Sequence, residues 1–305
     1  MLRLTSFFLY DIITSRGGTM KLILIPDELS NLGAYIDRGC EGIIIGLKDL
    51  STNYEVELDI EQIKLLKEKY PTIDIFVSMN KNFFNEVMEK VEQSLIELDK
   101  LNITGILYYD LSVVYLRNKN NLNVDLVWNQ THMVTNYNTC NYYYDLGVKY
   151  GFLSTEITLD EINEIKEKTN MKLFAFGYGY PVMAHTRRSL LTNYFVNRGK
   201  EYDGSVCHIY DNNNKFSLKE DETGTTFLND EFVNGSCLLT SSNIDYVVFN
   251  NNLYPEDKSL QLVSLITEYK TTNNERVIGE IEDLIGDYTN FFYKKTIFMV
   301  KKNDK

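Results

Sequence analysis

The run Gly42-Ile43-Ile44-Ile45-Gly46 (GIIIG) holds three consecutive β-branched apolar residues and no polar one. A strand with one solvent-facing side alternates apolar and polar residues, so a continuous apolar run is typical of a strand buried on both faces. Similar runs recur along the chain, and with this one they are Lys21–Ile25, Gly42–Gly46, Ile73–Val77, Ile103–Tyr108, Val124–Trp128, Gly151–Leu153, Lys172–Phe176 and Tyr246–Phe249.

Amphipathic segments separate most of these runs. A capping box of Thr158 and Glu161 opens one of them, and Gly147 is placed to end another. The predicted helices are Ile60–Tyr70, Phe83–Leu101, Leu111–Leu116, Tyr137–Leu146, Thr158–Lys168 and Leu260–Tyr269. About eight strands, nearly all followed by a helix, predict an α/β fold of the (β/α)8 TIM-barrel type. A doubly wound open sheet is the alternative, but the first strand runs into Pro26-Asp27-Glu28 rather than a glycine-rich phosphate loop.

Residues 177–245 interrupt this rhythm between the seventh and eighth strands. They contain a basic stretch, Thr186–Asn197, with helical character, and strand-like runs at Val206–Tyr210, Lys215–Leu218 and Thr225–Leu228. We expect an insertion here to lie over the C-terminal face of a barrel spanning residues 20–270. Residues 271–305, with a helix and a final strand-like run at Thr296–Val300, are expected to pack on the barrel as a C-terminal extension.

Residues 1–19 are interpreted as a non-native or disordered N-terminal extension, because Met20 directly precedes the first strand. The four cysteines, Cys40, Cys140, Cys207 and Cys237, form no CxxC pair, which favours reduced thiols in a cytoplasmic protein. No apolar run is long enough to span a membrane. A net charge of −12 argues against nucleic-acid binding through the overall field of the protein, so we expect RNA contact to be local or supplied by a partner.

Polar residues that follow the apolar runs converge on one mouth if the barrel closes. Each has two interpretations: it binds a ligand, or it caps a helix or ties loops together, as Asp110 and Asn136 suggest by their position before helices. Gly179 permits tight backbone at a strand exit. Next to it, His185, Arg187 and Arg188 lie in a local cationic segment suited either to an anionic ligand or to balancing nearby acids. The candidate pocket is therefore Asn80, Asp110, Asn129, Asn136, Ser154, Glu156, Gly179, His185, Arg187 and Arg188.

Common catalytic signatures are absent from the sequence. It contains no HExxH, no GxSxG and no GxxxxGK[ST] motif. The histidines His132, His185 and His208 lack metal-ligand spacing, and Cys207 with His208 is interpreted as a buried thiol beside an ordinary histidine. The residues alone therefore name neither a nucleophile nor a metal site.

Several blocks resemble the peptidase U32 family in their order along the chain. They are Trp128-Asn129, the run Thr135–Tyr142 (TNYNTCNY), Ser154-Thr155-Glu156, and Arg188–Phe195 (RSLLTNYF). Asn80 and Asp110 also fall where that family has an Asn and an Asp after barrel strands. The form of these blocks, on a chain of this length, is similar to the short paralogue that bacteria often encode beside a longer U32 protein.

The resemblance implies one of three functions. The leading one is that of a subunit for prephenate-dependent 5-hydroxylation of the wobble uridine of tRNA, acting with the longer paralogue. The family name implies collagenase-like peptide hydrolysis instead. A non-catalytic scaffold for the longer paralogue is the third.

Many family members hold a 4Fe–4S cluster with four cysteines. Here Val182 and Ser189 stand at the first two cluster positions, whereas Cys207 and Cys237 match the last two. Such clusters are normally held by four thiolates. We therefore expect no metal site and no cluster in this chain alone.

Overall fold

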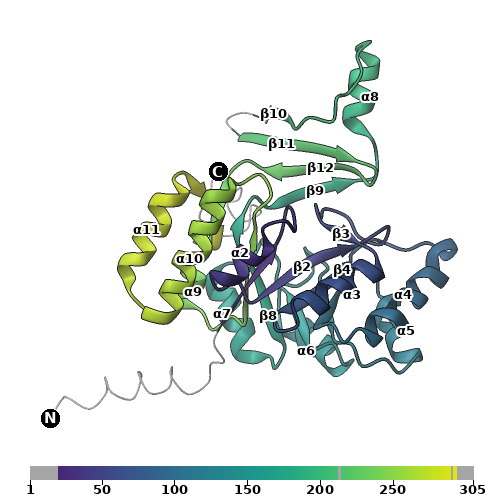
Figure 1. Ribbon diagram of the computed structural model, residues 1–305, viewed down its shortest axis with the longest axis horizontal. Coiled ribbons are helices and arrows are strands. Elements are labelled where there is room, and N and C mark those ends of the chain that lie inside the picture. The colour runs from purple at the N-terminus through teal and green to yellow at the C-terminus, as the bar shows by residue number, and fades with distance from the viewer. Residues whose placement is uncertain (1–19, 212–213, 290, 294–305) are drawn as a thin grey trace, which may run out of the picture.

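Eight parallel strands form a closed ring in the computed structural model, which describes residues 20–211, 214–289 and 291–293 (Figure 1). Each strand pairs with the next, and β14 closes the ring by pairing with β8 on one side and with β1 on the other. The expected (β/α)8 barrel is confirmed, and the open sheet is excluded. The strands are β1 (Lys21–Ile25), β2 (Gly42–Leu47), β4 (Asp74–Met79), β5 (Gly105–Tyr108), β6 (Leu126–Trp128), β7 (Tyr150–Phe152), β8 (Lys172–Gly179) and β14 (Tyr246–Asn250).

Side chains fill the interior of the barrel. Ile23, Ile44 and Leu107 point inward with a group of aromatic rings, and all three are fully buried. Phe174 stacks on Tyr246 with ring centroids 4.2 Å apart, and Phe76 meets Phe174 edge-on at 5.0 Å. Such packing leaves no pore through the described ring, so space for a ligand of the barrel itself lies at the ends of its strands.

Helices cover the outside of the ring. Two of them, α3 and α7, begin with complete capping boxes, at Asp59 and at Thr158 as expected. The long predicted helix starts only at Met88, because a 3-10 turn at Asn85–Val87 (η1) precedes it. The helices of the barrel are α2 (Leu32–Asp37), α3 (Ile60–Lys69), α4 (Met88–Lys100), α5 (Ser112–Lys119), α6 (Tyr137–Asp145), α7 (Leu159–Lys168) and α10 (Glu256–Thr272). No helix within the described ranges is long and apolar enough to cross a membrane.

The chain between β8 and β14 forms a second sheet over the C-terminal ends of the barrel strands (Figure 1). This roof sheet is antiparallel, in the order β10-β11-β12-β9. Its parts are β9 (Val182–Thr186), α8 (Leu190–Asn197), β10 (Cys207–Asp211), β11 (Asn214–Asp221) and β12 (Gly224–Asn229). The prediction of a helical stretch over Thr186–Asn197 was wrong at its start, because Thr186 pairs with Thr225 of β12 and so belongs to a strand.

Two short elements return the chain to the barrel. Strand β13 (Phe232–Asn234) pairs antiparallel with the end of β8, and α9 (Ser236–Ser241) follows it. A two-residue strand, β3 (Glu57–Leu58), extends the sheet beside β2.

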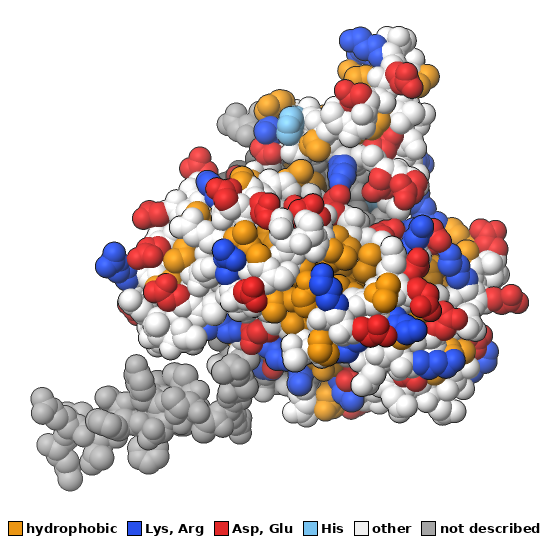
Figure 2. Space-filling model, in the orientation of Figure 1, with side chains coloured by type: hydrophobic (Ala, Val, Ile, Leu, Met, Phe, Trp, Pro, Cys, Tyr) orange, Lys and Arg blue, Asp and Glu red, His pale blue; other side chains and the backbone are white. Residues whose placement is uncertain are grey.

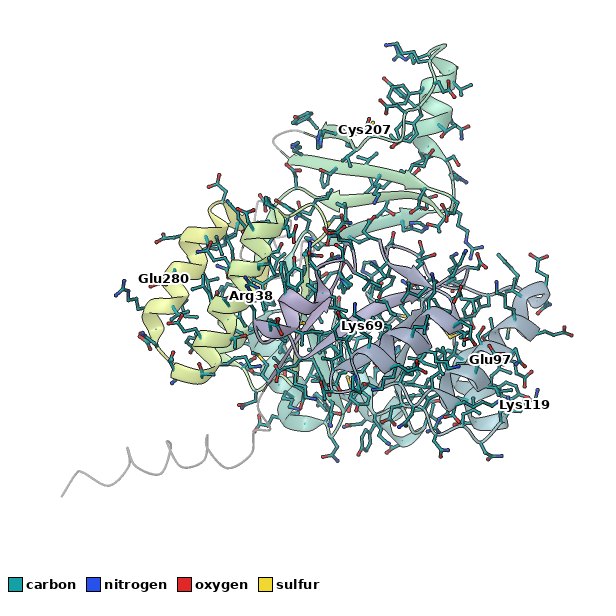
Figure 3. All side chains as sticks on the ribbon, viewed as in Figure 1. Arg38, Lys69, Glu97, Lys119, Cys207 and Glu280 are labelled. Atoms are coloured by element: carbon teal, nitrogen blue, oxygen red, sulfur yellow. The ribbon has the colours of Figure 1, made fainter. Side chains whose placement is uncertain are left out.

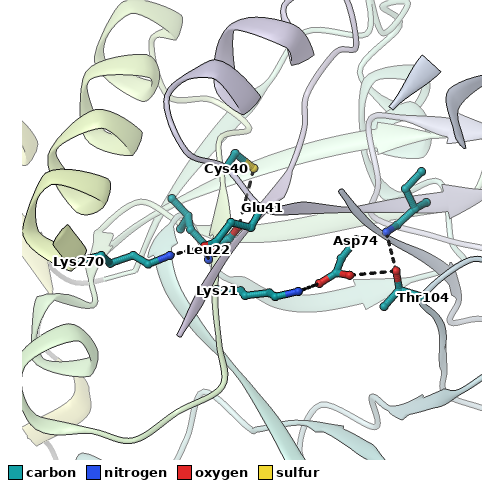
Figure 4. Close-up of polar contacts among 8 residues, drawn as sticks. Lys21, Leu22, Cys40, Glu41, Asp74, Thr104 and Lys270 are labelled. Carbon is teal, nitrogen blue, oxygen red and sulfur yellow. Dashed lines mark hydrogen bonds and ion pairs between the residues drawn. The ribbon is translucent and has the colours of Figure 1, made fainter. Parts of the chain in front are cut away.

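The C-terminal part packs against the barrel through α10. Helix α11 (Glu275–Ile285) lies beside α10, and β15 (Tyr288–Thr289) pairs with β13 before a 3-10 turn at Phe291–Tyr293. Figure 4 shows the opposite, N-terminal end of the barrel, where Lys270 of α10 reaches Glu41 and Lys21 pairs with Asp74 at 2.7 Å. The expected strand at Thr296–Val300 and the expected extension at 1–19 lie outside the described residues.

Candidate functional site

A pocket of about 610 Å3 lies at the mouth of the barrel, between the strand ends and the roof sheet. Its floor is apolar, with Ile25, Phe152 and Phe176 at the ends of β1, β7 and β8. Residues 181–187, in and around β9, line the opposite wall. The pocket therefore forms between two parts of the fold that are distant in sequence.

The lining is cationic although the protein is acidic. Lys81 and Arg187 line the pocket, and no Asp, Glu, Ser or Cys is among its lining residues in the described chain. Five asparagines, a residue type whose amide can donate and accept hydrogen bonds, share that lining: Asn53, Asn80, Asn82, Asn129 and Asn250. Such a site favours an anionic ligand with several oxygen atoms.

Asn80 follows β4 and holds the loop that follows β2. Its Oδ1 accepts a hydrogen bond from the backbone N–H of Thr52 at 2.8 Å, and its Nδ2 donates to the carbonyl of Thr52 at 3.0 Å. Both ends of the amide are thus satisfied by one residue. Asn80 fixes this part of the pocket wall by fixing Thr52.

His185 joins the roof sheet to the barrel. Its Nε2 lies 3.3 Å from the hydroxyl of Thr52, and its Nδ1 lies 3.0 Å from the hydroxyl of Thr226 in β12. Thr226 in turn donates to Asn53. Burial lowers the pKa of His185 below its ordinary value of 6.5, which favours the neutral ring at neutral pH.

Two neighbouring arginines in the cationic segment take different positions. Arg187 lines the pocket, donates from Nη2 to the carbonyl of Asn82 at 2.8 Å, and places its guanidinium 4.9 Å from the ring centre of Phe84. Both arginines are exposed to solvent, but Arg188 is not among the lining residues. The structure therefore brings only the first of the two to the site.

Asp110 and Asn136 take the structural roles left open for them. Asp110 accepts hydrogen bonds from the backbone N–H groups of Ser112 at 2.9 Å and Phe83 at 3.0 Å, tying two loops together. Burial raises the pKa of Asp110, but these hydrogen bonds outweigh it and lower the pKa overall. Asn136 caps α6 by accepting from Thr139 at 3.0 Å. Neither residue lines the pocket.

Ser154, Glu156 and Gly179 lie close to the pocket without lining it. Ser154 is buried, and its hydroxyl accepts from the backbone N–H of Glu156 at 3.2 Å. The carboxylate of Glu156 lies 3.2 Å from His132, which does line the pocket and had been assigned no role from the sequence. Tyr109 and Thr52 are further lining residues that sequence reasoning missed. The position of Tyr109 directly after β5 was the available signal.

The residues present do not fit a four-thiolate cluster. Val182 and Ser189 occupy two of the four expected positions, and neither side chain carries a thiol. Cys207 begins β10 in the roof sheet, where its side chain is half-buried rather than buried as expected. It lies well away from α9, which carries Cys237 (Figures 1 and 3). Across the described ranges, no group of three or more His, Cys, Asp or Glu is arranged to hold a metal ion.

The sequence model named Peptidase family U32 matches residues 27–248, a range that runs from the loop after β1 into β14. The chain belongs to this family. The U32 chain is 23% identical to tRNA hydroxylation protein P2 of Bacillus subtilis, over 91% of this chain and 99% of that protein. It is 24% identical to tRNA hydroxylation protein P1 of the same organism, over 60% of this chain and 44% of that protein. The solved U32 peptidase Mk0906 covers 78% of this chain at 15% identity, with a TM-score of 0.48.

Proposed function

We propose that this U32 chain is the shorter of two subunits that hydroxylate the wobble uridine of tRNA in the cytoplasm, with prephenate as co-substrate. The observation that carries the proposal is the extent of the match to tRNA hydroxylation protein P2, which covers 99% of that protein. The match to P1 covers only 44% of a longer protein. This chain therefore corresponds to P2 in length, and a longer U32 paralogue is the partner we propose.

The pocket supports an anionic co-substrate. Prephenate carries two carboxylates, and Lys81 and Arg187 provide two cations with no lining carboxylate to compete for them. The guanidinium is already oriented by Asn82 and Phe84, so little side-chain entropy is lost when it binds a carboxylate. The amide of Asn129, together with the apolar floor, would orient the rest of the ligand.

The family name suggests peptide hydrolysis, but this pocket provides few of the groups that such a reaction uses. The described lining offers neither the serine or cysteine of a common nucleophile nor a carboxylate to activate water. The two ring nitrogens of His185 lie beside the hydroxyls of Thr52 and Thr226. Cleavage of gelatin by the purified protein, abolished by Arg187→Ala, would restore this alternative.

The proposal is tested in a strain that lacks this gene and any other gene for the same modification. We expect 5-hydroxyuridine-derived nucleosides, measured by mass spectrometry of digested tRNA, to fall to background. The wild-type gene should restore them, whereas Arg187→Ala should restore less than about one tenth, since an arginine–carboxylate contact is worth roughly 1.5–3 kcal/mol. Arg188→Ala, which changes the adjacent exposed arginine, is the matched control and should restore the wild-type level. Unchanged modification in the deletion strain would refute the proposal, and full rescue by Arg187→Ala would favour a non-catalytic scaffold.

A further inference from the structure

Helix α8 presents apolar side chains to solvent on more than one side. Its eight residues, LLTNYFVN, include none that is charged. Only Leu191 is buried, whereas Leu190, Tyr194 and Val196 are 36%, 55% and 64% exposed. Leu190 and Tyr194 lie one turn apart on one side, and Val196 lies on another side. A helix that is apolar on several sides is typical of one that is enclosed by other protein.

Hydrogen bonds hold the helix at both ends. The carboxylate of Glu220 in β11 accepts hydrogen bonds from the backbone N–H groups of Leu191 at 2.7 Å and Thr192 at 3.0 Å. At the other end Gly199, with φ +68°, turns the chain back. The backbone N–H of Lys200 then donates to the carbonyl of Phe195 at 2.9 Å. Figure 1 shows α8 projecting from the roof sheet, away from the barrel. A projecting helix held at both ends loses little entropy when it docks.

Charged groups of both signs border the apolar surface. Arg198 and Lys200 follow the helix, and Glu201 and Asp203 come directly after them. Figure 2 shows basic and acidic side chains beside apolar ones at the tip of the projecting arm. The complementary surface is therefore an apolar groove with polar and charged groups at its rim.

The contacts that the aromatic rings of α8 already make favour a protein over RNA as the binding partner of the helix. A stacking platform for bases needs free aromatic faces and cationic side chains among them. The guanidinium of Arg198 lies over the ring of Tyr194 at 5.4 Å, and Phe195 already stacks on Tyr202 at 5.6 Å. The side chains of Leu190 and Val196 remain exposed. Aliphatic side chains of this kind are stabilised by burial against an apolar protein surface.

We propose that α8 docks into an apolar groove with a polar rim on the longer U32 paralogue. The inference rests on the proposed function for the identity of that partner. The helix-in-groove mode follows from α8 itself, because two exposed apolar sides require a concave partner. Leu190, Tyr194 and Val196 are the anchoring side chains, and the charged residues that follow the helix meet the polar rim.

The test measures the affinity of the purified full-length chain for the longer U32 protein of the same organism, by isothermal titration calorimetry. Tyr194→Glu and Val196→Asp should each weaken binding by about 10-fold or more, the effect expected of central apolar anchors. Tyr115→Glu is the matched control, because Tyr115 is a tyrosine on α5 that is 67% exposed. It should bind within about twofold of wild type. Circular dichroism and thermal unfolding of every variant show that the fold is retained.

Unchanged affinity in both α8 variants, no complex with wild-type protein, or an equal loss in the control would each overturn the inference. It would also be overturned if the variants weakened only tRNA binding or only self-association, since the occupant would then be RNA or a second copy. Failure of the proposed function is distinguishable. In that case tRNA hydroxylation is normal without this gene, while the α8 variants still weaken the complex.

Discussion

At the scale of single residues, Gly179 shows how backbone geometry shapes the pocket. It ends β8 with φ +119°, and a Cβ built on it would lie 2.2 Å from the carbonyl oxygen of Asn250 in β14. Any side chain would therefore push apart two neighbouring barrel strands at the mouth. The structure gives this candidate residue a role in backbone packing beside the pocket.

Gly179→Ala is expected to lower the free energy of unfolding by about 2 kcal/mol or more, because the new methyl group meets rigid backbone at a positive φ. The matched control is Gly279→Ala in α11, where nothing lies within 4 Å of the added Cβ. That change should raise stability by about 0.5–1 kcal/mol, as alanine is the better helix former. Urea unfolding measures both. Equal effects of the two substitutions would contradict the packing argument.

His185 should make the stability of the protein depend on pH. Burial lowers the pKa of the folded-state ring below the unfolded value of 6.5, so the unfolded chain binds more protons below that pH. Stability from this residue is therefore complete above pH 6.5 and is lost as the pH falls through and below it. His185→Gln should reduce the decrease in unfolding temperature between pH 7.5 and pH 5.5. If the variant keeps the whole decrease, the acid sensitivity has another source.

The sequence identified several residues of the mouth but could not show which way each side chain points. Asn80, Asn129, His185 and Arg187 line the pocket, and Arg188 does not. The two arginines are consecutive and both follow the end of β9, so no signal in the sequence shows which one faces the cavity. Thr52 and His132 were missed because each lies in a loop without a motif, and their roles come from partners distant in sequence.

At the scale of elements, the anchoring of α8 depends on one carboxylate. Glu220 of β11 accepts hydrogen bonds from two backbone N–H groups at the start of α8, and Thr192 and Thr225 add hydroxyl donors. A negative charge at this end also stabilises the helix dipole. The N-cap residue of α8, Ser189, makes no capping hydrogen bond with its side chain. The carboxylate of Glu220, from the roof sheet, takes over this role.

Glu220→Ala is expected to destabilise the start of α8 by about 1–2 kcal/mol, the usual cost of losing an N-cap. Hydrogen exchange of the Leu191 and Thr192 amides should become roughly tenfold faster or more, since each 1.4 kcal/mol corresponds to a factor of ten. Glu222→Ala, in the exposed turn between β11 and β12, is the control and should leave this exchange unchanged. Unaltered exchange in Glu220→Ala would show that other contacts fix the helix.

Elements were predictable where burial and capping leave a strong local pattern. All eight barrel strands were found because a strand buried on both faces is continuously apolar, and Thr158 marked the start of α7. Helix α2 was missed because it has six residues, two of them buried, and no side-chain cap. Strand β9 was missed because its residues are exposed or half-buried and show no alternation. Its existence depends on pairing with β12, which lies about forty residues further along the chain.

At the scale of the whole molecule, net charge limits what the chain can bind alone. A charge of −12 repels the phosphate backbone, and few counterions can be released on contact. We expect the isolated chain to bind tRNA with a dissociation constant weaker than about 10 μM at 150 mM salt, and binding to appear only with the longer paralogue. Fluorescence anisotropy with labelled tRNA measures both. Submicromolar binding by the isolated chain would contradict this expectation.

The pairing of β1 with β14 also sets when the protein can finish folding during its synthesis. β1 is complete at Ile25, and one of the two strands that pair with it, β14, begins only at Tyr246. At translation rates of about 5–20 residues per second, one edge of β1 waits for roughly 10–45 s. Throughout that interval the nascent chain carries an unpaired apolar strand edge, the kind of surface that draws chaperones and seeds aggregation. Ribosome-bound chains that stop before residue 246 therefore need protection that the released protein does not.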